Sequence, residues 1–300
     1  MLFRSQQGVQ CCVSVQAGNG RVAIAARHLQ QDGLCHGYHA ATCQDLGELP
    51  SFINTVLSPL ETKASQTEAI AILAPGDYQT FIIDRPNVTE QQLSAAVRWA
   101  VADQLSFSID EALFECCPVP LVNPATSVVQ VMVVATLKQT VLTLKQRMEQ
   151  MGLTVTHVGI PELATLALPA IQAGGDEAMA VIRALPNGMQ LMVLSQQQLV
   201  LTAMLPVLPM TANEALQQTF ILAVSQALFR YSKSAPEVDT EAMPLYWLLE
   251  GNDMDAVMKS ITQQLPNANH AVFLSDELQQ PTLTTPLSAQ DAAVIAGLML

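Results

Sequence analysis

Hydrophobic positions near the start of the chain recur in short runs separated by tight turns. Apolar residues dominate 9–15, 21–29 and 34–42, and the turns between them read AGNG and QQDG. Runs of this length, bounded by Gly, Asn and Asp, are typical of β-strands joined by hairpin turns. The pattern predicts a three-stranded meander, then a helix within 46–57 and an apolar strand at 68–74.

The next block alternates helical and strand patterns. One helix is predicted to begin at a capping box of Thr89 and Gln92, and a second carries an apolar stripe closed by Gly152. The strands around them are expected at 78–84, 112–119, 127–136 and 153–160. The order β-α-β-β-α-β predicts a self-contained subdomain over 77–158.

A second meander follows the subdomain. Its strands are expected at 178–185, 189–195 and 198–207, with a turn at Asn187 and Gly188. Thr211 and Glu214 are predicted to cap a long helix through 215–234. The remaining elements are a strand at 245–251, a helix at 253–265, a strand at 270–274 and a final helix after Ser288.

The same unit therefore occurs twice, as a meander followed by alternating helices and strands. A duplicated unit of this kind predicts an α/β, actin-like (ribonuclease H-like) two-lobed fold with an inserted β-α-β-β-α-β subdomain. Lobe I is expected to comprise 1–76, 159–175 and 288–300, the inserted subdomain 77–158, and lobe II 176–287.

Composition narrows the class of protein. Half of the 300 residues are hydrophobic and 13% are charged, which is typical of a globular protein. The net charge of −13 disfavours nucleic-acid binding and direct docking on an anionic membrane. No apolar stretch reaches the roughly 18 residues of a spanning helix, and the N-terminus lacks a signal-peptide core. We expect a cytoplasmic protein without a direct membrane span.

The cysteines favour buried thiols over disulfides or a metal site. Cys11–Cys12 and Cys116–Cys117 are adjacent pairs within strand-like runs, where neighbouring side chains point to opposite faces. Cys35, His36, His39 and Cys43 resemble a ligand set, but on a strand the two cysteines would lie about 26 Å apart. We therefore expect reduced thiols and no metal.

The stretch from 75 to 120 carries a distinctive set of residues. They are Pro75, Tyr78, Pro86, Val88, Glu90, Ala96, Arg98, Trp99, Asp103, Asp110, Glu111, Pro118 and Pro120. In this order and spacing they resemble the signature of the PilM family of type IV pilus assembly proteins, and more closely that of its MshI relatives in mannose-sensitive haemagglutinin (MSHA) pilus biogenesis. Segments 225–234 and 292–300 also resemble this family, which shares its fold with the cytoplasmic part of the type II secretion L protein, GspL.

The resemblance implies a cytoplasmic scaffold that is peripheral at the inner membrane through its partners. It implies binding of the cytoplasmic tail of a bitopic PilN-like membrane protein, and contacts with other platform proteins and the separate assembly ATPase. We expect the tail to lie in a groove between lobe I and the inserted subdomain, by strand addition or peptide-in-groove docking.

The residues for ATP chemistry depart from the actin-like pattern. Actin-like ATPases carry an Asp-x-Gly turn after the first strand of each lobe, which positions Mg²⁺ and cradles phosphates. Here Gln16 and Gly18 occupy those positions in the first hairpin, and Arg183 and Leu185 occupy them in the second. Neither hairpin contains an Asp or Glu. We expect a pseudo-ATPase with no catalytic residues and no cofactor.

Three alternatives stay open. Gly18 and Gly251 are the best remaining nucleotide contacts, so an ATP- and Mg-binding, nucleotide-dependent switch is the second hypothesis. An unrelated small-molecule or hydrolytic enzyme on a similar duplicated fold, such as a sugar kinase, is the third. Kinases of that fold need an Asp near the cleft, and Asp84, Asp103 and Asp110 all fall in the inserted subdomain. Arg98 and Trp99 fit either a partner-binding anchor or, as we expect, a packed Trp beside a surface ion pair.

Overall fold

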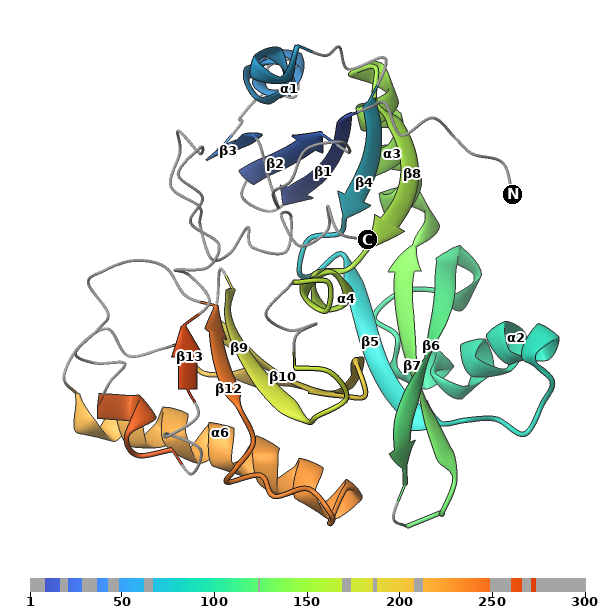
Figure 1. Cartoon of the computed structure of the whole chain (residues 1–300). Helices are drawn as coiled ribbons and strands as arrows, with labels where there is room; N and C mark the ends of the chain where they lie inside the picture. The colour runs from blue at the N-terminus through green and yellow to red at the C-terminus, as the bar shows by residue number, and fades with distance from the viewer. Residues whose placement is uncertain are drawn as a thin grey trace.

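Two sheets of the same strand order build the two lobes of the computed structural model (Figure 1). The structure describes residues 9–16, 21–28, 37–42, 49–61, 67–123, 125–168, 174–185, 188–207, 213–248, 260–265 and 271–273. Gly18, Gly251 and the predicted helix after Ser288 lie outside these residues.

The first sheet has the order β3-β2-β1-β4-β8. Its strands are β1 (Val9–Gln16), β2 (Arg21–His28), β3 (Gly37–Thr42), β4 (Thr67–Ile72) and β8 (Thr154–Gly159). The meander is antiparallel, whereas β4 runs parallel to both β1 and β8. Helix α1 (Leu49–Leu57) lies against β2 and β3 and continues into a 3-10 turn at Ser58–Leu60.

The second sheet repeats this plan with the order β11-β10-β9-β12-β13. Its strands are β9 (Met179–Leu185), β10 (Gly188–Ser195), β11 (Gln198–Leu205), β12 (Leu245–Leu248) and β13 (Ala271–Phe273). Again β9 is antiparallel to β10 and parallel to β12. The matching topologies confirm the predicted duplication and the actin-like, two-lobed arrangement.

Helix α6 (Glu214–Ser234) packs along the second sheet. Its buried stripe includes Phe220 and Tyr231, and the ring of Phe220 stacks on that of Trp247 with 6.3 Å between centroids. Burying a large aromatic side chain contributes about 2–3 kcal/mol. One face of this helix therefore belongs to the core.

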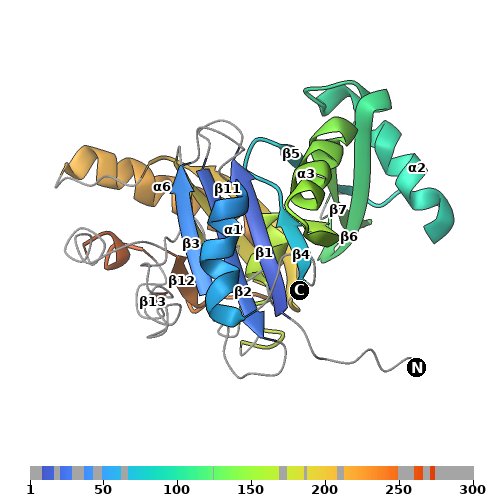
Figure 2. The same ribbon diagram turned by 90° about the horizontal axis from the view of Figure 1, so that it is seen from above.

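The inserted part has its own sheet, with the order β5-β7-β6. Its elements are β5 (Tyr78–Asp84), α2 (Glu90–Ala100), short 3-10 turns at Ala102–Gln104 and Ile109–Glu111, β6 (Ala112–Val122), β7 (Val129–Leu137) and α3 (Lys138–Gln150). Figure 2 shows α2 on the side of this sheet that faces away from the lobes, and α1 crossing the first sheet.

The two faces of the central strand β7 pack into two different hydrophobic cores. Val131 and Val133 pack with Leu93 and Val97 of α2 in a small outer core. The intervening residues, such as Met132, point the other way and join the main core that runs through both lobes. Since neighbouring side chains on a strand point to opposite faces, the inserted sheet has an outer face covered by α2 and an inner face turned to the lobes.

The assignment of 153–160 to the inserted subdomain is corrected by the structure. We expected this strand to close that subdomain, but β8 pairs with β4 and forms the edge of the first sheet. The duplication gives the reason, because β8 takes the place in lobe I that β13 takes in lobe II. The inserted sheet therefore has three strands, and α3 returns the chain to lobe I.

Of three predicted helix ends, Gly152 and Thr89 lie where the sequence placed them, and the cap of α6 does not. Gly152, at φ +82°, follows α3 as predicted, and Leu153 N–H donates to the Met148 carbonyl at 3.0 Å in a Schellman-type cap. At α2, Thr89 holds the N-cap position but its side chain caps no backbone N–H. At α6 the cap is Asn213 in place of Thr211.

Candidate functional site

The five-residue helix α4 (Pro161–Thr165) stands where lobe I, the inserted sheet and lobe II meet. It follows β8 directly and begins at Pro161, whose ring fixes a helical φ at a position that needs no N–H donor. Its side chains serve two sites. Glu162 enters a polar network with lobe II, and Leu163 lines a groove beside the inserted sheet.

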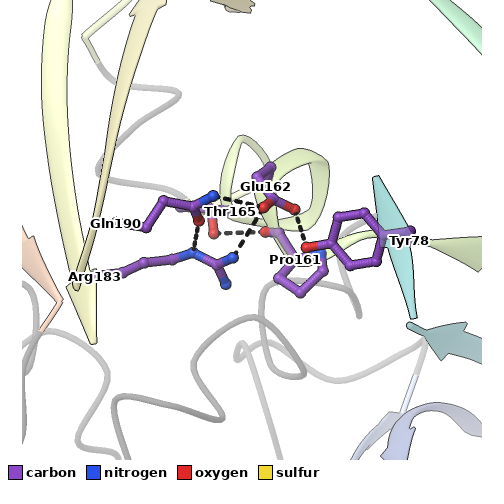
Figure 3. A network of polar contacts seen from close by, with 6 residues as sticks. All are labelled: Tyr78, Pro161, Glu162, Thr165, Arg183 and Gln190. Carbon is purple, nitrogen blue, oxygen red and sulfur yellow. Dashed lines mark hydrogen bonds and ion pairs between the residues drawn. The ribbon is translucent and has the colours of Figure 1, made fainter. Parts of the chain in front are cut away.

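The carboxylate of Glu162 joins three parts of the molecule (Figure 3). Its Oε1 accepts hydrogen bonds from Arg183 Nη2 at 3.2 Å and from Gln190 Nε2 at 2.8 Å. Its Oε2 accepts from the hydroxyl of Tyr78 at 2.6 Å. Tyr78 opens the inserted sheet, whereas Arg183 and Gln190 lie on β9 and β10 of lobe II.

The network is buried, so its energetics depend on complete pairing. Glu162 is 2% exposed and Arg183 is 4% exposed, and Arg183 Nε also donates to Gln190 Oε1 at 2.6 Å. Buried charges are tolerated when they are paired and hydrogen-bonded, as here. Burial, followed by the negative charge of Glu162, raises the pKa of Tyr78 well above its usual value. Tyr78 therefore stays a hydrogen-bond donor at neutral pH.

Arg183 is the residue that sequence analysis placed at the acidic position of the second phosphate turn. The structure shows its guanidinium turned to Glu162 and Gln190 within the protein (Figure 3). Leu185, at the expected glycine position, pairs with Gly188 across the hairpin. In the first hairpin Gln16 pairs with Arg21 at the ends of β1 and β2. The glycines proposed as remaining nucleotide contacts, Gly18 and Gly251, lie outside the described residues.

An apolar groove of about 290 Å³ lies on the other side of α4. It runs between the inner face of the inserted sheet and the edge of lobe I formed by β8, with α3 beside it. The apolar side chains that line it include Leu73, Leu113, Val134, Val141, Val158 and Leu163. This is the groove between lobe I and the inserted subdomain that the sequence analysis anticipated.

The lining of the groove fits the apolar side chains of a ligand and presents few reactive groups. The hydroxyl of Thr136 already donates to the Asp77 carbonyl at 2.7 Å, and Glu115 is exposed. Burial, helped by the charge of Glu115, raises the pKa of the Cys117 thiol, which disfavours the reactive thiolate. The groove therefore resembles a binding surface more than a catalytic centre.

Two sheet edges flank the groove. β6 is an outer strand of the inserted sheet, and β8 is an outer strand of the first sheet. An outer strand leaves backbone N–H and C=O groups available to an added strand. Pro118 and Pro120 lack N–H donors and so restrict such pairing toward the end of β6.

The structure confirms some of the predictions made for the other candidate residues and contradicts others. Arg98 forms the predicted surface ion pair, with Nη2 2.8 Å from Asp110 Oδ1. Trp99 does not pack on the sheet as expected, because it is 71% exposed and points away from the α2 stripe. The described residues contain no cluster of His, Cys, Asp or Glu that could hold a metal ion. The ring of His39 lies against that of Phe52 in a tilted arrangement, with 4.6 Å between centroids, while Cys35, His36 and Cys43 lie outside those residues.

The cysteines in the described ranges are free thiols. Cys11 and Cys12 are fully buried, and Cys116 and Cys117 are half-buried. This confirms the prediction that neither adjacent pair forms a disulfide. No helix within the described ranges has the length and apolar character of a membrane span.

Comparison with solved structures places this geometry among known folds. The chain matches a structure described as a PilM-PilN type IV pilus biogenesis complex, with a TM-score of 0.63 and 15% identity over 97% of both chains. It also matches the cytoplasmic domain of EpsL, an inner membrane component of the type II secretion system of Vibrio cholerae, with a TM-score of 0.54 and 12% identity over 98% of this chain and 96% of that one. A Bacteroides thetaiotaomicron protein with an actin-like ATPase fold and unknown function matches with a TM-score of 0.53 and 9% identity over 98% of each chain.

The chain has the actin-like fold. Neither a protein-family profile nor a curated protein sequence matches it. The actin-like fold of this chain thus rests on the duplicated sheets and the three similar structures, all at low sequence identity.

The Glu162 network was missed by the sequence analysis, although one signal for it was present. Arg183 is a charged residue within the apolar run of β9, and a charge in a buried strand requires a partner. The partner could not be named, because Glu162 is 21 residues away and reaches Arg183 only through the meeting of α4 with lobe II.

Proposed function

We propose that this chain is a cytoplasmic scaffold of a type IV, MSHA-like pilus assembly platform at the inner membrane. It binds the cytoplasmic tail of a bitopic PilN-like protein and performs no ATP hydrolysis. The proposal includes peripheral attachment to the membrane through that partner, and contacts with further platform proteins and the assembly ATPase.

The observation that carries the proposal is the apolar groove between the inserted sheet and lobe I. It occurs in a chain that matches the PilM-PilN complex structure along 97% of its length. The groove combines apolar lining with two sheet edges, which are the two features that bind an extended peptide. The EpsL domain, from another inner-membrane system, supports the same kind of attachment.

Charge complementarity favours a membrane protein's tail as the occupant. Cytoplasmic segments next to a membrane span are enriched in Lys and Arg. This chain carries a net charge of −13, and the exposed Glu115 lies at the groove. Opposite charges accelerate the encounter, and the apolar groove supplies the specific contacts.

The non-hydrolytic part of the proposal is supported by Arg183. A metal-binding carboxylate is expected at that place in an actin-like ATPase, and here a buried cation fills it. The neighbouring acid, Glu162, accepts hydrogen bonds from Tyr78, Arg183 and Gln190 and so has its charge neutralised within the protein. These hydrogen bonds join α4 to lobe II through the protein's own side chains.

The binding test uses a fluorescently labelled synthetic peptide of the PilN-like partner's cytoplasmic tail, titrated with the full chain by anisotropy. The variants are Leu113→Asp and Val158→Asp, two groove residues that are 41% and 39% exposed. Each is expected to weaken binding by about ten- to a hundredfold, since burying one such side chain contributes about 1.5–3 kcal/mol.

The matched control is Leu142→Asp, which changes a 51% exposed leucine on α3 that does not line the groove. It should leave the affinity unchanged, which separates loss of groove contacts from added negative charge. Unchanged affinity in both groove variants would place the tail elsewhere and overturn the assignment.

A further inference from the structure

A second recess, of about 360 Å³, lies where the inserted sheet meets lobe II. It is formed by the inner face of β5 and β7, by β11 and by the C-terminal end of α6. Along β7 the same face serves both recesses, with Met132 in this cavity and Val134 in the apolar groove.

The chemistry of this cavity differs from that of the groove. Its polar lining consists of Thr80, Gln130, Thr202, Arg230, Tyr231 and Ser234, and no acidic residue lines it. The chain carries 26 acidic and 13 basic residues, so a lining with one cation and no acid differs from the rest of the molecule and favours an anion over a cation. Apolar side chains from the strands complete the wall.

Arg230 is the cation that lines this cavity. It is exposed on the last turns of α6 and forms no ion pair or hydrogen bond with any residue that the structure describes. By contrast, Arg85, Arg98 and Arg183 are all paired with carboxylates. Lys233, on the same helix, lies 4.6 Å from the ring centroid of Phe229. A guanidinium presents a planar set of donors that matches a carboxylate or phosphate.

We propose that this cavity binds a small amphipathic anion, with one carboxylate or phosphate group on a compact apolar body. Arg230 pairs with the anionic group, and the hydroxyl and amide groups of Thr202, Gln130 and Ser234 supply further hydrogen bonds. The apolar strand side chains contact the body. Cavities of this size with a few convergent polar groups are typical of small-molecule sites, and they occur preferentially between structural units.

A ligand in this cavity would also affect how the inserted sheet and lobe II are held together. Its walls come from the inserted sheet on one side and from lobe II on the other. A ligand that contacts both sides stabilises the arrangement in which they meet, by an amount set by its affinity and concentration. This inference concerns binding alone and is independent of the tail-binding groove.

The test is ligand-observed NMR on the full chain with three matched probes. Benzoate and phenyl phosphate carry an anionic group on an aromatic body, and benzamide is the neutral counterpart. Both anions should bind at millimolar concentration or below, and at least tenfold more tightly than benzamide. Equal binding of all three probes, or no binding of either anion, overturns the proposal.

The variant Arg230→Gln removes the charge at an exposed position and should weaken binding of both anions at least tenfold. Lys233→Gln removes one charge from the same helix without changing the cavity lining, and it should bind both anions as the unmodified chain does. If the two variants behave alike, the anions bind by general charge attraction and the assigned site is wrong.

Discussion

At the scale of single residues, the Glu162 carboxylate forms hydrogen bonds with residues of two other parts of the fold. It neutralises Arg183 inside the protein and accepts the hydroxyl proton of Tyr78 in a hydrogen bond. Because its partners belong to lobe II and the inserted sheet, one side chain holds three parts of the fold together. Breaking a buried ion pair from one side leaves a buried charge without a partner, which is far more destabilising than loss of an exposed pair.

Glu162→Gln should therefore lower the free energy of unfolding by about 3–5 kcal/mol, measured by urea denaturation. The control is Glu90→Gln, the same acid-to-amide change in the exposed pair of Arg85 and Glu90, which should change it by less than about 1 kcal/mol. Adding Arg183→Met to Glu162→Gln should restore part of the loss. Equal effects at the two pairs would contradict the role given to Glu162.

A second residue-scale prediction concerns alkaline pH. Burial raises the pKa of the Cys11 thiol from 9.0 to about 12. The folded state holds this proton more tightly than the unfolded state, so stability is complete below pH 9 and falls between pH 9 and pH 12. By pH 10.5 the loss from Cys11 amounts to about 2 kcal/mol.

Urea denaturation at pH 8 and pH 10.5 measures this loss. Cys11→Ala should be less stable than the unmodified chain at pH 8, because it leaves a small cavity. Its further loss between the two pH values should be about 2 kcal/mol smaller. An identical pH-dependent loss in both proteins would show that Cys11 is not the titrating group.

At the scale of elements, the sequence predicted what depends on local pattern. The meanders, the long helix and the Gly152 cap follow from alternation, helical periodicity and the need for positive φ, and the structure confirms them. The membership of β8 could not be read locally, because its pairing with β4 is a contact between segments separated by the whole inserted part. For the same reason the Glu162 network could not be predicted. The position of the groove was expected from the family resemblance.

The position of β8 also changes how the inserted part should be tested. Deleting 77–158, as the sequence alone suggests, would remove most of the strand Thr154–Gly159 and leave β4 without its parallel neighbour. Loss of binding in such a deletion would then report damage to lobe I. Point substitutions at the groove avoid this ambiguity.

The N-terminal caps of α2 and α6 differ, and this difference gives a pair of predictions that can be compared directly. Asn213 caps α6, with Oδ1 accepting from Leu216 N–H at 3.2 Å, whereas Thr89 precedes α2 without a capping bond from its side chain. Asn213→Ala should destabilise the protein by about 1 kcal/mol and Thr89→Ala by a few tenths, measured by thermal unfolding. A larger effect at Thr89 would mean that the predicted capping box forms in solution.

At the scale of the whole molecule, the duplicated sheets and the inserted sheet meet around α4. On one side of this helix the buried ion pair of Glu162 and Arg183 joins α4 to lobe II. On the other side lies the apolar groove. The contacts between α4 and lobe II are made by the protein's own side chains. We therefore propose that the molecule is a scaffold whose apolar groove is its binding surface.

The most direct test of the scaffold interpretation is to measure the dissociation constant of the partner's tail peptide with and without Mg-ATP. If nucleotide binding were coupled to the groove, ATP would shift the tail's dissociation constant, typically by about 5–150-fold. The scaffold interpretation predicts tight binding of the labelled tail peptide with the same dissociation constant in both titrations. A magnesium-dependent change in that constant, in either direction, would contradict it and establish a nucleotide-dependent switch.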